Sequence, residues 1–301
     1  MATTAPLVWL DGKIVPATGA TLPLMAHAAQ RGSLVFDVGA WHATARGPEL
    51  FRVEDHVARF IASAAIVGLE LAFDAVALVR AAIDVVKAND TRSDGLVRWS
   101  VFYAAAEPDL LPRDGATHVA VAAQLLQDPP RATPIRVATF HDARKAAPDA
   151  LPPTAKAAAA YLGPMLARRR AVAAGADDVV LLDVNGNIAE GPIANVFAVI
   201  GNELWTPPLG HILPGITRRS VLEVARDLGI AVREEPLSRA AFQAADEAFL
   251  TGTSLPLAPI GAIDGRGLAG PGPITSRVLE TLLAARRGTA ATSTRWLTLV
   301  E

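Results

Sequence analysis

The chain of 301 residues contains no cysteine, which excludes disulfide bonds, a thiolate nucleophile and a zinc site built on cysteine. Charge is also sparse and balanced, with 28 Lys and Arg residues against 30 Asp and Glu residues. This balance argues against a nucleic-acid-binding protein, whose surface is strongly basic. Because 51% of the residues are hydrophobic, intrinsic disorder is excluded as well. The composition therefore predicts a globular protein of a reducing compartment, the cytoplasm.

Membrane and metal signals are missing too. No stretch of 18 apolar residues without a charge occurs, so no membrane-spanning helix is predicted. Residues 1–12 carry no basic residue ahead of an apolar stretch, which argues against a signal peptide. The glycine-rich nucleotide fingerprints and the His-Glu-x-x-His zinc motif are absent, and the six histidines are scattered. The sequence therefore predicts no metal site.

Lysine is the scarcest charged residue, with Lys13, Lys87, Lys145 and Lys156 as its only representatives. Arginine keeps its proton at any useful pH, whereas a desolvated lysine can lose its proton and act as a nucleophile. Lys156 lies between a proline-rich loop and four alanines, which suits a Schiff-base lysine. A lysine at a helix N-terminus with its ammonium group in water is the alternative interpretation.

A proline-rich segment at residues 127–134 is predicted to link a small α+β domain, 1–126, to a larger domain, 135–301. An Asp-Gly turn at residues 11–12 predicts a hairpin, and Asp55 is expected to cap a helix that begins at His56. Strands are predicted at 7–10, 13–15, 33–43, 49–53, 96–105, 117–124, 135–140, 178–183, 196–199 and 203–205. Helices are predicted at 56–69, 74–87, 157–174, 217–228 and 274–285.

Three further segments in the second half carry candidate site residues. Glu190 follows a strand and precedes a glycine, as a solvated loop carboxylate or one aimed at a cofactor would. Gly215-Ile216-Thr217 opens a helix, so it predicts either an anion site at the helix N-terminus or an ordinary threonine cap. The turn Thr251-Gly-Thr253-Ser254 offers a second set of hydroxyl donors for a phosphate.

Taken in order, these motifs resemble the class IV (fold type IV) pyridoxal-phosphate (PLP) aminotransferases, and in particular their branched-chain branch. The similarity extends over almost the whole chain. It is carried by Trp9–Gly12, Glu54–Phe60, Lys145–Pro148, Pro152–Ala157, Asp183–Gly186, Glu190-Gly191, Leu213–Arg218, Asp246–Phe249, Thr251–Thr253 and Gly272–Thr275.

The resemblance implies a two-domain α+β fold, a small α/β domain plus a larger β-barrel-like domain with helices. It implies that Lys156 holds PLP covalently and moves the proton, that Glu190 contacts the pyridine nitrogen, and that Tyr161 binds the ring hydroxyl. The cofactor phosphate would be bound by Arg59, Ile216, Thr217 and Thr253. The family also builds its site at a subunit interface, so a homodimer or a higher homo-oligomer is expected. The expected substrates are a small amino donor and a 2-oxo acid.

The substrate side departs from the family pattern. Branched-chain enzymes carry tyrosine, arginine and tyrosine where this chain has Arg31, Ala40 and Leu96, whereas Arg98 is retained. Substrate contacts are therefore predicted for Arg31, Phe36, Arg98, Thr253 and Ser254, although both arginines would equally suit structural ion pairs.

The segment from Leu34 to Val38 is similar to the (R)-selective amine transaminases. The sequence thus predicts a transaminase acting on branched-chain or hydrophobic amino acids or amines, with an (R)-selective amine:pyruvate transaminase as the alternative. An aminodeoxychorismate lyase-like enzyme and a D-amino-acid transaminase are further alternatives.

Overall fold

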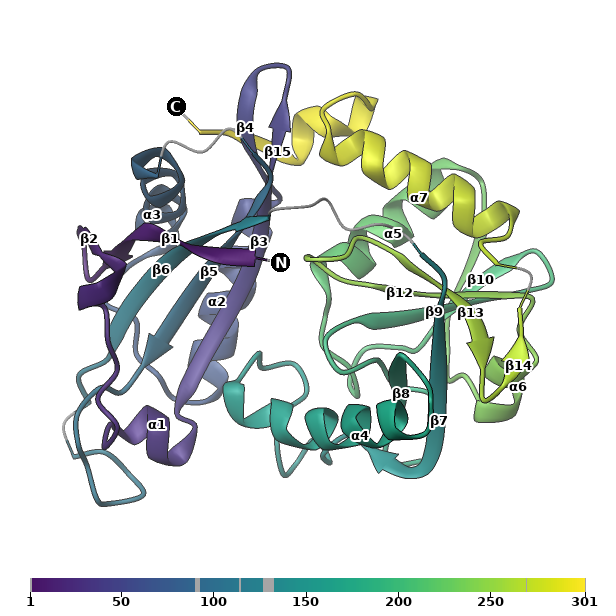
Figure 1. Cartoon of the computed structure of the whole chain (residues 1–301), viewed down its shortest axis with the longest axis horizontal. Helices are drawn as coiled ribbons and strands as arrows, with labels where there is room; N and C mark the ends of the chain where they lie inside the picture. Colours follow the sequence, from purple (N-terminus) through teal and green to yellow (C-terminus); the bar gives the residue numbers. More distant parts are fainter. Residues whose placement is uncertain (1, 90–92, 114, 127–132, 269, 301) are drawn as a thin grey trace. The chain divides into compact units, whose positions relative to one another are not determined.

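The computed structural model describes residues 2–89, 93–113, 115–126, 133–268 and 270–300. It divides into two compact units, each built around one sheet (Figure 1). Unit 1 comprises Met1–Pro129, Ala155–Ala159 and Ala284–Glu301, and unit 2 comprises Pro130–Thr154 and Ala160–Leu283. Most of the predicted linker, residues 127–132, lies outside the described residues, and the predicted domain boundaries stay a prediction.

Unit 1 contains a seven-stranded sheet in the order β15-β4-β3-β5-β6-β1-β2. Its strands are β1 (Ala2–Leu10), β2 (Lys13–Pro16), β3 (Leu34–Thr44), β4 (Gly47–Phe51), β5 (Gly95–Phe102), β6 (His118–Leu126) and β15 (Leu297–Leu299). Every neighbouring pair is antiparallel. The predicted hairpin is confirmed, because Leu10 pairs with Lys13 and both Asp11 and Gly12 have positive φ, as a type I′ turn requires.

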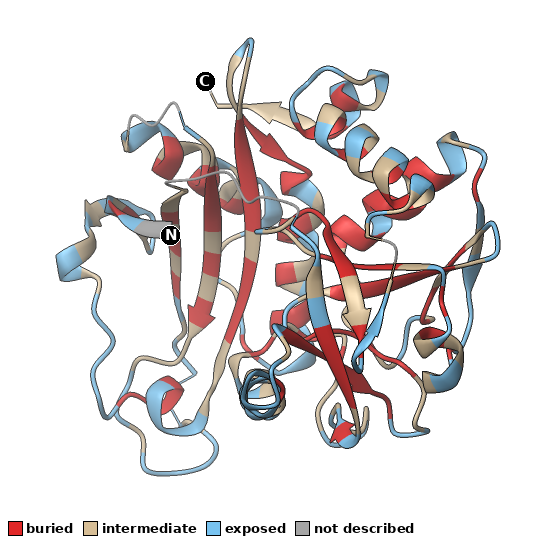
Figure 2. Cartoon of the chain, turned by 45° about the vertical axis from the view of Figure 1, so that its right-hand side comes forward, coloured by how far each residue is buried: buried red, intermediate tan, exposed pale blue. Residues whose placement is uncertain are grey.

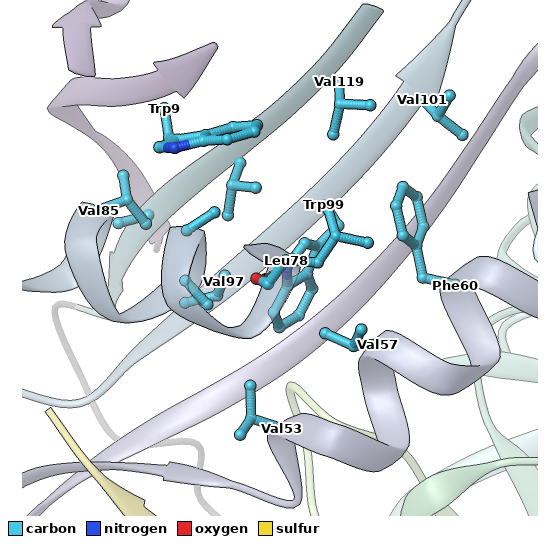
Figure 3. Close-up of a cluster of buried hydrophobic side chains, with 14 of the residues drawn as sticks. Trp9, Val53, Val57, Phe60, Leu78, Val85, Val97, Trp99, Val101 and Val119 are labelled. Carbon is cyan, nitrogen blue, oxygen red and sulfur yellow. Dashed lines mark hydrogen bonds between the residues drawn. The ribbon is translucent and has the colours of Figure 1, made fainter. Parts of the chain in front are cut away.

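One face of this sheet is covered by α2 (Val53–Ile66) and α3 (Ala75–Ala88), and α1 (His27–Arg31) precedes β3. Figure 3 shows the core between them, where Trp99 and Val97 of β5 meet Val57 and Phe60 of α2. Side chains alternate between the faces of a strand, so Val35 and Trp41, which belong to this core, lie on one face of β3 and their neighbours in sequence lie on the other. That second face of β3 holds Phe36.

The start of α2 differs from the prediction. Arg52, in the left-handed region with φ of 51°, is the N-cap residue, and the helix begins at Val53. Asp55 therefore lies in the first turn and does not cap the helix, so its predicted role was wrong. Its carboxylate instead accepts a hydrogen bond from Arg52 Nε at 2.6 Å. The predicted start of the next helix is confirmed, since the Asp74 side chain accepts from the Ala77 amide at 2.8 Å.

Unit 2 is an eight-stranded mixed sheet with the path β11-β10-β9-β12-β13-β7-β8, and β14 pairs with β13. Its strands are β7 (Ile135–Arg144), β8 (Asp178–Leu182), β9 (Asn195–Ile200), β10 (Glu203–Thr206), β11 (Ala231–Glu234), β12 (Glu247–Thr251), β13 (Ala258–Ile263) and β14 (Arg266–Gly267). The strands β8, β9 and β12 are almost continuously buried, as Figure 2 shows by their red colour.

The helices of unit 2 are α4 (Leu162–Ala173), α5 (Ile216–Asp227), α6 (Arg239–Gln243) and most of α7 (Pro273–Arg286), whose last turn belongs to unit 1. The helix predicted over 157–174 is a 3₁₀ turn at Ala158–Tyr161 followed by α4. No helix in the described part of the chain is long and apolar enough to cross a membrane. Two sheets with segregated helices confirm the predicted α+β class.

Candidate active site

The segment around Lys156 is held at an edge of β3. β4 pairs with β3 only at Ala40–Thr44, and beyond it residues 156–157 take its place. Phe36 donates its amide hydrogen to the Lys156 carbonyl at 3.1 Å, and Val35 forms a bridge with Ala157. The Lys156 amide donates to Ser63 Oγ of α2 at 3.1 Å. The backbone of Lys156 is therefore fixed between β3 and α2, two residues before the 3₁₀ turn that begins at Ala158.

Two cationic side chains, those of Lys156 and Arg98, lie over the aromatic ring of Phe36. Lys156 Nζ lies 5.0 Å from the ring centroid and Arg98 Cζ of β5 lies 4.5 Å from it. Arg98 pairs with Val38, one pleat from Phe36, so its side chain is on the same face of the sheet. The structure therefore brings together three of the predicted site residues, Phe36, Arg98 and Lys156, on one face of unit 1.

Arg59 lies on α2, and its guanidinium forms a two-point ion pair with Asp37 of β3. Nε donates to Oδ2 at 2.7 Å and Nη2 donates to Oδ1 at 2.8 Å. Asp37 is fully buried, and burial raises its pKa, but Arg59 and His56 together hold the pKa well below its usual range. The buried Asp37 carboxylate therefore stays ionised beside the Arg59 guanidinium.

Arg31 is more exposed than Arg59 and Arg98, the other two arginines of the candidate site. It ends α1, is exposed, and its guanidinium makes long hydrogen bonds of 3.4 Å to the carbonyl groups of Gln30 and Pro108. No carboxylate partner is seen for it among the described contacts, so the structural ion pair considered for Arg31 is not observed in this part of the chain.

Glu190 is a buried residue of unit 2 and not a solvated loop carboxylate. Its carboxylate forms an ion pair with Lys145, accepts from Asn195 Nδ2 at 2.8 Å, and accepts from the Leu213 amide at 3.2 Å. These three donors come from separate segments and fix the position of the carboxylate. An anionic group held in this way suits a protonated pyridine nitrogen.

Asn195 contacts three segments of unit 2 that contain predicted site residues: the Glu190 loop, the segment before α5 and the end of β12. Its amide group also donates to the Leu213 carbonyl at 3.0 Å, and its backbone pairs with Thr251, the last residue of β12. A Cβ atom on Gly215 would lie only 1.9 Å from Asn195 Oδ1, so only glycine allows α5 to begin this close. The Glu190 loop, the start of α5 and the turn that contains Thr253 and Ser254 therefore meet at the same ends of β9 and β12.

The start of α5 excludes one of the two interpretations of Thr217, that of a helix cap. Gly215 is the N-cap residue, which makes Ile216 and Thr217 the first two helical residues, so Thr217 is not the cap. The first amide bonded within the helix is that of Arg219, which donates to Gly215 at 3.0 Å. The amide groups of Ile216 and Thr217 precede it, at the end of a helix where anions bind.

Several residues of the candidate site were not predicted from the sequence. Asp37, His56, Asn195 and Lys145 all contact a predicted site residue or its partner, over separations of up to 45 positions. Asp37, His56 and Lys145 lie in segments that carry a family resemblance, at 34–38, 54–60 and 145–148, but the sequence assigned none of them a role in the site. Tyr161 ends the 3₁₀ turn after Lys156, and Ser254 is exposed beside the half-buried Thr253.

Comparison with known proteins assigns the family. Residues 35–263 match the family model described as amino-transferase class IV, and the chain belongs to this family. It is therefore a PLP-dependent aminotransferase, as the sequence predicted.

Within the family, the chain is similar to branched-chain-amino-acid aminotransferases. The Escherichia coli K12 enzyme is 32% identical, with 99% of this chain and 98% of that protein covered. The Thermoproteus uzoniensis enzyme, solved with norvaline, superposes with a TM-score of 0.94 at 33% identity, covering 99% of this chain and all of that one. The Thermobaculum terrenum enzyme, solved in its PLP form, gives a TM-score of 0.93 at 28% identity, covering 99% of each chain. These similarities confirm the predicted fold type IV.

Proposed function

We propose that this aminotransferase moves an amino group from a branched-chain or other hydrophobic amino acid, or from an amine, to a 2-oxo acid. The observation that carries the proposal is the face of β3 and β5 beside Lys156. Arg98 there offers a cation for a carboxylate, and the next pair along the two strands, Ala40 and Leu96, is buried and apolar. One cation beside an apolar surface suits a substrate with one carboxylate and a hydrocarbon side chain.

The proposed function also assigns the residues that would hold the cofactor. When bound, PLP supplies the electron sink for breaking the bond between hydrogen and the amine-bearing carbon. We assign Lys156 as the residue that holds the cofactor and carries this proton, Glu190 as the acceptor from the ring nitrogen, and Tyr161 as the donor to the ring hydroxyl. The phosphate is assigned to Arg59, Thr253 and the first turn of α5, through Ile216 and Thr217.

The (R)-selective amine transaminase is the second candidate. Ala40 and Leu96 face each other across β3 and β5, so the two positions at which branched-chain enzymes carry arginine and tyrosine form one apolar pair here. Loss of both polar groups removes donors for a carboxylate and favours an amine that has none. In this case Arg98 and Arg31 serve the 2-oxo acid alone.

A half-reaction screen separates the two candidates. The PLP form is mixed with L-leucine, D-alanine or either enantiomer of 1-phenylethylamine, and loss of the cofactor's visible absorption band is followed. We expect L-leucine to react, and Arg98→Met to raise the KM for L-leucine by about tenfold or more, since one charged hydrogen bond is lost. Reaction with the (R)-amine alone would support the second candidate. Arg80→Met, at an exposed arginine of α3, is the matched control.

We also propose a homodimer or a higher homo-oligomer. The apolar side chains of Leu162, Met165 and Leu166 lie on one face of α4, at spacings of three and four residues, and all three are exposed. We expect light scattering to give at least twice the chain mass of 31.4 kDa. Met165→Glu should weaken the association, whereas Val76→Glu, at an exposed valine of α3, should not. An active enzyme that is strictly monomeric would contradict this proposal.

A further inference from the structure

We infer that Asp37, supported by His56, is a positioning residue that orients Arg59 for the cofactor phosphate. This inference rests on the proposed function, in which Arg59 binds that phosphate. Asp37 is not one of the residues that the motifs of the sequence assign to the site. It follows Phe36 on β3 and, because side chains alternate along a strand, it points to the opposite face, toward α2.

The side chain of Asp37 has four hydrogen-bond donors around it. Arg59 contributes Nε and Nη2, His56 contributes Nδ1 at 2.7 Å, and the Val38 amide contributes a fourth at 2.7 Å. A carboxylate has about four lone-pair positions, so the set is matched to its capacity. The paired Nε and Nη2 fix the plane of the Arg59 guanidinium, because both oxygens must be reached at once.

The protonation states support this arrangement. Burial lowers the pKa of His56, and the charges of Arg59 and Lys156 lower it further, against the effect of Asp37. His56 is therefore neutral and, since the Asp37 carboxylate only accepts, its Nδ1 carries the hydrogen. The His56 ring is held in place by stacking on Trp99, with 11° between the two planes. A Cβ atom at position 39 would lie only 3.1 Å from the Trp99 ring, so glycine at this position leaves room for Trp99. His56 thus holds Asp37 without adding a charge.

Two opposite effects of Asp37 on phosphate binding can be separated by experiment. As a neutralising charge, Asp37 weakens the attraction between Arg59 and a phosphate. As a positioning group, it holds the guanidinium in one orientation and so strengthens binding. The second effect is expected to dominate, because a buried two-point pair leaves the Arg59 side chain few alternative rotamers.

The test is a titration of the apoenzyme with PLP and, in parallel, with pyridoxal, which lacks the phosphate. Binding is followed by the visible absorption band, and the unfolding temperature of each apoenzyme is recorded. We expect Asp37→Asn to raise the Kd for PLP by about tenfold or more, as losses of orienting partners do in other sites, and to leave the Kd for pyridoxal unchanged. Asp142→Asn, which removes the partner of exposed Arg170, is the matched control and should change neither.

A double-mutant cycle with Arg59→Met keeps the inference testable if Asp37→Asn does not fold. The double variant removes both charges of the pair, and its PLP affinity should equal that of Arg59→Met because Asp37 acts through Arg59. Unchanged or tighter PLP binding by Asp37→Asn would overturn the inference, as would a double variant much weaker than Arg59→Met. If Arg59→Met itself weakens PLP and pyridoxal equally, the assignment of Arg59 to the phosphate fails, which is a separate result.

Discussion

Lys156→Ala will abolish the visible absorption band of the bound cofactor and reduce transamination by at least about 10²–10⁴-fold, the usual contribution of a positioned acid–base group. The variant should still fold, since Lys156 is bound to its neighbours through its backbone. Its carbonyl accepts from Phe36 and its amide donates to Ser63, and alanine keeps both contacts. The measurements are the absorption spectrum with added PLP and the rate of the half-reaction.

The other lysines provide the controls for this prediction. Lys87 is exposed near the end of α3, so Lys87→Ala should leave spectrum and rate unchanged. Lys145 forms an ion pair with Glu190, so it is not expected to bind the cofactor in place of Lys156. Reduction with borohydride, followed by peptide mapping, should label Lys156 in the wild type. A band that persists in Lys156→Ala, or a label on another lysine, would refute the assignment.

Glu190→Gln is expected to leave PLP bound and to slow the half-reaction by about a hundredfold, because an unprotonated pyridine is a poorer electron sink. The residues proposed to bind the phosphate are not altered by this change, so we expect the cofactor to be retained. The amide also cannot replace the carboxylate locally, since its NH₂ group would face the donors of Lys145, Asn195 or Leu213.

Loss of the Lys145 ion pair has to be separated from loss of the pyridine contact. Lys145→Met keeps Glu190 and two of its three donors, so we expect a much smaller decrease in rate. The double variant Lys145→Met/Glu190→Gln leaves no unpaired charge and should remain as slow as Glu190→Gln. Glu235→Gln, at an exposed carboxylate, is the neutral control. Equal rates for the wild type and Glu190→Gln would exclude this role for Glu190.

Local signals in the sequence predicted most of the secondary structure. The Asp-Gly turn between β1 and β2 and the start of α3 near residue 74 each depend on neighbouring residues, and both are as predicted. The start of α2 was missed because Arg52 adopts a left-handed conformation that a propensity argument does not favour. Asp55 is a good capping residue by type, and its ion pair with Arg52 is a consequence of that conformation.

The sequence assigned roles in the site only at positions where the order of motifs carries information. Lys156, Glu190 and Thr217 belong to those motifs. Asn195 and Asp37 are ordinary residues of strands in the sequence, and their importance lies in contacts made after folding, such as the pair between Asp37 and Arg59, 22 positions apart. The burial of Glu190 was also missed, because loop position alone does not reveal three donors from separate segments.

The edge pairing between β3 and residues 156–157 has a consequence for recombination between relatives. The segment that contains Lys156, the proposed cofactor lysine, is grouped with unit 1, although the sequence on both sides of it, Pro130–Thr154 and Ala160–Leu283, is grouped with unit 2. A chimaera joined at 127–134 would therefore combine β3 and Arg59 of one parent with the lysine segment of the other. Family shuffling would preserve the site only where Val35, Phe36 and residues 155–157 are inherited together.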